Sequence, residues 1–133
     1  MRRPRFRLSD VAQQVVGGFL LAGPFVVTEE VWTLAASMSW WQAVATVVIV
    51  ALIGYGALYT ADRDRDPESE DDVAGVPLRF VSLMAVAFGS VVLLALLFDA
   101  PDAFDAGWGV GVRAVCIGAV FSVVGAATAD SVF

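Results

Sequence analysis

The segment Val11–Trp32, VAQQVVGGFLLAGPFVVTEEVW, decides how the chain is interpreted. Its first seventeen residues contain two amides and no charge, and they run directly into Thr28-Glu29-Glu30. A helix of about 20 apolar residues crosses the hydrocarbon of a bilayer. Adjacent acids within a span are costly unless they reach water or a partner, so they are expected near the far interface. Pro24, one turn earlier, removes a backbone donor and is predicted to bend the helix.

The composition of the whole chain is typical of a membrane protein. Hydrophobic residues make up 59% of the 133 residues and charged residues 17%, whereas soluble domains have about 45–50% and about 25%. Most charges lie in the termini and in one linker. The sequence therefore predicts an all-α membrane protein, one membrane domain over residues 1–133 that crosses the cell membrane several times.

The charge balance gives a second indication. The net charge is −6, all eight basic residues are arginine, and there is no histidine. Strong acidity without lysine is typical of proteins adapted to high salt, where charges are heavily screened, although a GC-rich genome could produce the same bias. Because nucleic-acid binding needs a basic surface, no nucleic-acid partner is expected.

Four apolar segments are expected to form a bundle of transmembrane helices. They cover about residues 10–30, 41–59, 77–98 and 109–128. An acidic linker over 61–75, with seven acids and two arginines, is typical of a disordered segment. Arginine favours the cytoplasmic side, and it gathers in the N-terminal tail and around the linker. Both termini are therefore expected in the cytoplasm.

Small residues predict close packing between these helices. Gly18 and Ala22 are four residues apart in the first span, and Gly111, Gly118 and Gly125 repeat every seven residues in the fourth. In lipid, helices associate through close contacts of small residues because an apolar driving force between them is missing. These residues could pack the four helices of one chain, or they could join it to a second copy or another membrane protein. The lipid bilayer is the other expected partner.

An outer cluster of Glu29, Glu30 and Arg113 is the first candidate for chemistry. Arg113 is the only basic residue expected on the outer side, and an arginine in a span usually pairs with a carboxylate. The cluster could carry protons or cations, or it could be a structural ion pair. Gln13 and Gln14, near the inner end of the first span, could line a pore mouth or hydrogen-bond to a neighbouring helix.

Catalytic and metal sites are not expected. The chain has no histidine for general base catalysis and no glycine-rich phosphate loop, and its single cysteine, Cys116, allows no thiolate metal cluster. Asp62-x-Asp64-x-Asp66 begins like a calcium loop, but Pro67 occupies the position that needs glycine. No enzyme activity, cofactor or metal is therefore expected.

The residues GFLLAGP at 18–24, followed by TEEVW at 28–32, resemble the first-helix signature of an uncharacterised family of small integral membrane proteins. The family is a domain of unknown function from halophilic archaea and some bacteria. Thr28, Glu30, Val31 and Trp32 match its pattern, whereas Glu29 stands where an apolar residue is expected. The resemblance implies location and fold, and it makes Glu30 the more important acid. It carries no activity.

Taken together, these patterns favour a polytopic membrane protein with a structural, accessory or self-associating role. The alternative is a small oligomeric channel or transporter for protons or cations that uses the outer carboxylates and Arg113. Both readings place the chain in the membrane and differ in whether polar side chains serve packing or conduction.

Overall fold

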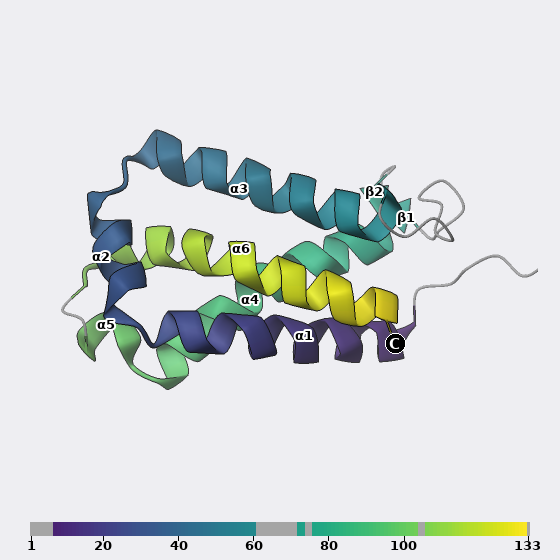
Figure 1. The fold of residues 1–133 in the computed structure, drawn as a ribbon, viewed down its shortest axis with the longest axis horizontal. Coiled ribbons are helices and arrows are strands. Elements are labelled where there is room, and N and C mark those ends of the chain that lie inside the picture. Colours follow the sequence, from purple (N-terminus) through teal and green to yellow (C-terminus); the bar gives the residue numbers. More distant parts are fainter. Residues whose placement is uncertain (1–6, 61–71, 74–75, 104–105, 133) are drawn as a thin grey trace, which may run out of the picture.

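The computed structural model of the chain describes residues 7–60, 72–73, 76–103 and 106–132, and nearly all of this part is helical (Figure 1). The helices are α1 (Leu8–Val26), α2 (Glu29–Ser37), α3 (Trp40–Tyr55), α4 (Leu78–Leu97), α5 (Ala100–Ala103) and α6 (Trp108–Val132). One π-helical turn, η1 (Gly56–Thr60), continues α3, and β1 (Asp72–Val73) pairs antiparallel with β2 (Val76–Pro77) before α4. The predicted all-α fold is confirmed. Most of the expected acidic linker, residues 61–71 and 74–75, lies outside the described residues.

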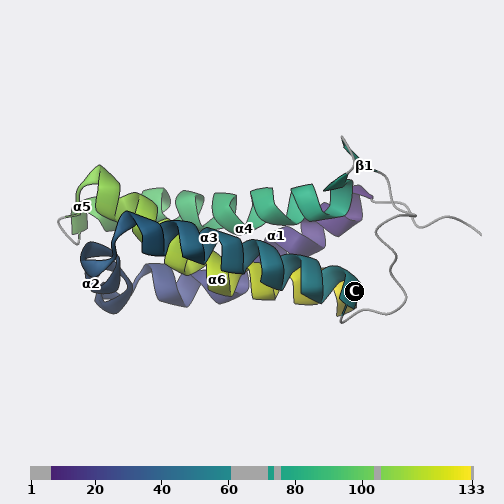
Figure 2. The same cartoon turned by 90° about the horizontal axis from the view of Figure 1, so that it is seen from above.

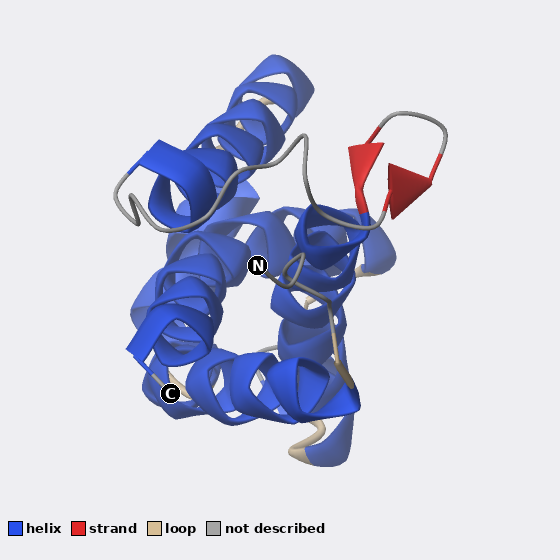
Figure 3. Cartoon of the chain, turned by 90° about the vertical axis from the view of Figure 1, so that its right-hand side faces the viewer, coloured by secondary structure: helices blue, strands red, loops and turns tan. Residues whose placement is uncertain are grey.

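The long helices run side by side, with α6 packed against α1, α3 and α4 (Figures 1 and 2). Three helices, α3 with η1, α4 and α6, are long and apolar enough to cross a membrane, and α1 with α2 makes a fourth if the bent pair counts as one span. We call the end where α1 and α4 begin and α6 ends the inner end, and the opposite end the outer end. The start of α1 and the end of α6 lie at this inner end, which Figure 3 views end-on (Figures 1 and 3).

Helix α1 ends at Val26, before Glu29 and Glu30, which the sequence predicted at the outer end of the first span. The chain turns by 80° between α1 and α2. Thr28 Oγ1 donates to the carbonyl of Phe25 at 2.9 Å, and the Trp32 indole Nε1 donates to the carbonyl of Val26 at 2.9 Å. These contacts satisfy two carbonyls that the end of a helix leaves without partners. The bend follows Pro24, which lies inside α1, by one turn.

A capping box opens α3. The Ser39 hydroxyl accepts from the backbone N–H of Gln42, and the Gln42 side chain accepts from the backbone N–H of Ser39 at 2.8 Å. Each side chain satisfies a donor at the start of the helix that has no intrahelical partner. The second span therefore begins at Trp40, close to the expected residue 41.

Buried apolar side chains form two clusters, one in each half of the bundle. The outer cluster, around Ala22, Trp32 and Val91, comes from α1, α2, α4, α5 and α6, and no described residue of α3 belongs to it. The inner cluster, around Val50 and Val123, comes from α3, η1, α4 and α6. In α3, Val50 and Gly54 are buried in the inner half, whereas Ala43 is the buried residue of the outer half.

Candidate functional site

The predicted outer residues lie in two separate environments. Glu29 and Glu30 occupy the first turn of α2, where the helix dipole favours acids, and both are exposed. The buried face of α2 carries Val31, Trp32 and Ala35 instead. Because the chain breaks before Glu29, the two acids sit on a helix that crosses the end of the bundle. They reach its surface, where they line a hollow of about 370 Å³.

Arg113 joins the start of α6 to the connection between α2 and α3. Its guanidinium donates to the carbonyl of Met38 and, through Nε, to the carbonyl of Gly109 at 3.1 Å. The guanidinium carbon lies 5.1 Å from the ring centroid of Trp40, a cation–π distance. None of the ion pairs between described residues joins Arg113 to Glu29 or Glu30. The expected pair is therefore replaced by backbone and aromatic contacts.

Most of the small residues that were expected to mediate packing make contacts between helices of the same chain. A Cβ atom added to Gly125 would lie 2.1 Å from the carbonyl oxygen of Gly17, so α1 and α6 touch through their backbones there. An added Cβ on Gly118 would lie 2.7 Å from Val91, and Ala22 is fully buried. A Cβ on Gly18, another of these residues, would lie 3.0 Å from the Ser122 hydroxyl and 3.3 Å from that of Ser90.

Gly111 differs from the other glycines of this set. An added Cβ there would meet no atom within 4 Å. The regular spacing in the sequence therefore groups glycines with two different roles. Gly118 and Gly125 allow contacts within the chain, whereas Gly111 leaves its helix backbone open on one side.

The inner end holds a buried polar network that the sequence reasoning did not assemble. Arg79, in the first turn of α4, pairs with Asp130 on α6 at 2.7 Å and with Asp10 on α1 at 3.2 Å. Arg79 is 5% exposed and Asp130 4%. The charge of Arg79 therefore lies between three helices, where it pairs with acids on α1 and α6. Burial of a charge requires such partners.

Gln14 extends this network into the bundle. Its side chain is fully buried, and its Nε2 donates to Asp130 Oδ2 at 3.0 Å. The Ser82 hydroxyl donates to Gln14 Oε1 at 2.7 Å. Of the two roles considered for Gln14, the structure shows the hydrogen bonds to neighbouring helices. One sequence signal was present: Asp10, Arg79 and Asp130 fall near the ends of three spans that the predicted topology places on one side.

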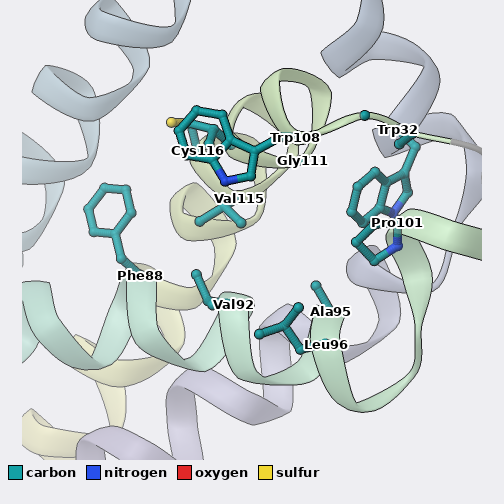
Figure 4. Close-up of a pocket in the computed structure, with 13 residues that line it drawn as sticks. Trp32, Phe88, Val92, Ala95, Leu96, Pro101, Trp108, Gly111, Val115 and Cys116 are labelled. Atoms are coloured by element: carbon teal, nitrogen blue, oxygen red, sulfur yellow. The ribbon is translucent and has the colours of Figure 1, made fainter.

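An apolar groove opens in the outer half, and the sequence did not reveal it. It has a volume of about 690 Å³ and uncharged lining residues (Figure 4). One wall comes from Phe88, Val92 and Leu96 on α4, and the other from Trp108, Val112 and Cys116 on α6; Gly111 also lines it. No α3 residue is among the described lining residues. The volume lies within the range of about 300–1,000 Å³ of ligand pockets.

The outer loop carries a pair of interacting acids. A hydrogen bond with Asp102 and the negative charge of that residue raise the pKa of Asp99. Asp99 also has a positive φ of 57° between α4 and α5, a conformation that aspartate tolerates better than most residues. In the described part of the chain, no group of three or more histidine, cysteine or acidic residues is placed to hold a metal ion.

Comparison with known proteins identifies a family. Residues 3–132 match the model of a family described as "Putative integral membrane protein (DUF2391)". Comparisons with curated proteins and with solved structures give no match. The family match covers almost the whole chain, in agreement with the resemblance seen in the first span.

Proposed function

The chain belongs to the DUF2391 family of integral membrane proteins, and from this premise we propose that it is a non-enzymatic structural or accessory protein of the cell membrane. It acts by associating laterally with other membrane proteins, including copies of itself. The observation that carries this proposal is the apolar groove of about 690 Å³ between α4 and α6, which the described residues leave unfilled. Large apolar grooves are typical of interaction sites.

The polar contacts of the spans support the same proposal. Arg79, Asp130 and Gln14 bind one another across three helices, and Arg113 binds backbone carbonyls and an aromatic ring. Polar groups in a membrane often mark a transport route, but these groups are used to fix helices against each other. This supports a packing role for them.

The channel alternative lacks the contact on which it was built. It required Glu29 or Glu30 to interact with Arg113, and the acids instead lie exposed on α2. A titrating carboxylate paired with an arginine inside the bundle would have favoured conduction. The groove, which is apolar, favours association over ion transport.

The proposal extends to orientation and environment. We place both termini in the cytoplasm because Arg7, just before α1, and Arg79, in the first turn of α4, lie at the inner end, and arginine favours the cytoplasmic side. The net charge of −6 suggests adaptation to high salt, since screening reduces repulsion between acids. Unfolding measured at rising KCl tests this: stability should increase with salt, and a decrease would contradict the adaptation.

Reconstitution in liposomes tests the proposed function. Two populations of the protein, labelled with a donor and an acceptor dye, should show energy transfer that falls as lipid is added. The same vesicles should show no flux of protons, Na⁺ or K⁺ above that of protein-free vesicles. Absence of energy transfer at every protein-to-lipid ratio would contradict self-association, and flux lost in Glu30→Gln would support the channel.

A further inference from the structure

We propose that a water molecule is bound inside the bundle between α1, α4 and α6, where it bridges the hydroxyls of Ser122 and Ser90 beside Gly18. Ser122 is fully buried, and its Oγ has no hydrogen-bond partner among the described residues. A buried hydroxyl without a partner is costly, and buried waters in proteins typically bind such groups. The Ser122 hydroxyl is therefore the group that calls for a polar ligand at this position.

The missing side chain of Gly18 brings two hydroxyls to one place. A Cβ added to Gly18 would lie 3.0 Å from Ser122 Oγ, 3.3 Å from Ser90 Oγ and 3.5 Å from a methyl of Val86. Ser90 is 4% exposed, so two buried hydroxyls from different helices lie beside the same point of α1. A water oxygen near this point is within hydrogen-bond reach of both. A buried water needs two to four polar partners, and the two serines supply two.

Close packing of α1 against α6 encloses this position. A Cβ added to Gly125, about one turn after Ser122, would clash with the carbonyl of Gly17, so the two backbones touch there. Gly17 and Gly18 are also buried. The Ser122 hydroxyl can therefore bond only to a neighbouring helix, to the backbone of its own helix or to an enclosed molecule.

The surroundings favour a neutral ligand over an ion. The nearest atoms of other helices around the Gly18 position are two hydroxyl oxygens and a methyl carbon. Asp130 follows Ser122 by eight residues on α6, which is about 12 Å along the helix. A cation at this depth would lack a charged partner, and burying an unpaired charge costs far more than burying a neutral molecule. Water can donate to one hydroxyl and accept from the other.

The proposed water lies on the same seam between α1 and α6 as the inner polar network. Gly18 follows Gln14 by four residues on α1, and Ser122 precedes Asp130 by eight on α6. Residues at these spacings lie on one face of a helix. Because Gln14 donates to Asp130 at 3.0 Å, the water forms a second polar link between the same helices, deeper in the bundle.

The sign of one substitution tests for the water. Ser122→Ala removes a partner of the water, so the unfolding equilibrium constant in mixed micelles should rise by about threefold to tenfold, as for one lost hydrogen bond. If the hydroxyl has no partner, the same change removes a buried polar group and lowers the constant, which would overturn the proposal. Ser37→Ala is the control, since this exposed hydroxyl bonds only to the Leu34 carbonyl of its own helix, and it should change the constant by less than about twofold.

A double-mutant cycle measures whether the two serines share the ligand. Ser90→Ala and Ser122→Ala should be coupled, so that the double variant changes the unfolding constant by less than the product of the two single effects. Independent effects of the two substitutions would overturn the bridge.

A crystal structure from a lipidic mesophase separates a bridging water from a direct bond. Density for a water should lie within about 3.2 Å of both Oγ atoms, and it should be lost in Gly18→Ala, whose Cβ takes its place. A Ser122 hydroxyl bonded directly to Ser90, or to the carbonyl of Gly118 one turn earlier, with no such density, would overturn the proposal.

Discussion

The guanidinium of Arg79 and the carboxylate of Asp130 form an ion pair of 2.7 Å between α4 and α6. The two side chains are 6% and 0% exposed. Because Asp130 also accepts from Gln14 on α1, one carboxylate fixes the relative position of three helices. The ion pair lies at the inner end of the bundle, so it does not fix how the helices pack in the outer half.

Removing the Asp130 carboxylate should destabilise the protein strongly. Asp130→Ala leaves the Arg79 charge buried with one fewer partner, and breaking a buried pair costs about 3–5 kcal/mol. Unfolding in mixed micelles with a denaturing detergent measures the loss. Glu30→Gln, at an exposed position, is the control and should change stability by less than about 0.5 kcal/mol. Equal stability of Asp130→Ala and the wild type would refute the role of this pair.

The backbone contact between α1 and α6 makes a second prediction. Gly125→Ala would bring a Cβ to 2.1 Å from the Gly17 carbonyl oxygen, so the helices must separate, at a cost of about 1–3 kcal/mol or more. Gly89→Ala meets open space and should be neutral or stabilising by up to about 1 kcal/mol, because alanine favours helices. The free energy of unfolding of the two variants should differ in this direction; similar values would contradict the contact.

Glu30 and Arg113 should behave as independent residues. Glu30 is exposed on α2, and the guanidinium of Arg113 binds the carbonyls of Met38 and Gly109. A double-mutant cycle with Glu30→Gln and Arg113→Gln should therefore be additive within about 0.5 kcal/mol. A larger coupling in the free energy of unfolding would restore the ion pair that the sequence suggested.

The sequence predicted the fold better than it predicted the site. The apolar lengths identify the spans because the hydrocarbon thickness of the bilayer acts on each segment separately. The Ser39–Gln42 capping box was also predictable, since both partners are local in sequence. The break at Thr28 was not, because it depends on the Trp32 indole reaching the carbonyl of Val26.

The buried network depends on contacts that are distant in sequence. The fourth span was predicted to end near residue 128, but α6 continues to Val132, and this places Asp130 opposite Arg79. The groove likewise depends on how α4 and α6 pack, which no single segment encodes. Local sequence patterns therefore predict the individual helices, whereas the contacts between helices depend on tertiary packing.

The interaction between Asp99 and Asp102, in the connection after α4, predicts that the stability of the protein depends on pH. A hydrogen bond with Asp102 and the charge of that residue raise the pKa of Asp99. The folded state then holds its proton at a pH where the unfolded state has lost it, so stability falls as pH rises from the ordinary pKa of aspartate through the raised one. Carboxyl NMR titration should show Asp99 titrating above an ordinary aspartate. In Asp102→Asn it should return toward the usual range; an unchanged titration would contradict the coupling.

The most direct test of lateral self-association is to count labelled chains in single liposomes by stepwise photobleaching while the protein-to-lipid ratio is varied. The proposed function predicts that the fraction of two-step traces rises with protein density along a reversible monomer–dimer isotherm, beyond random co-occupancy. One-step traces in excess at every density, matching a monomeric control protein, would contradict it.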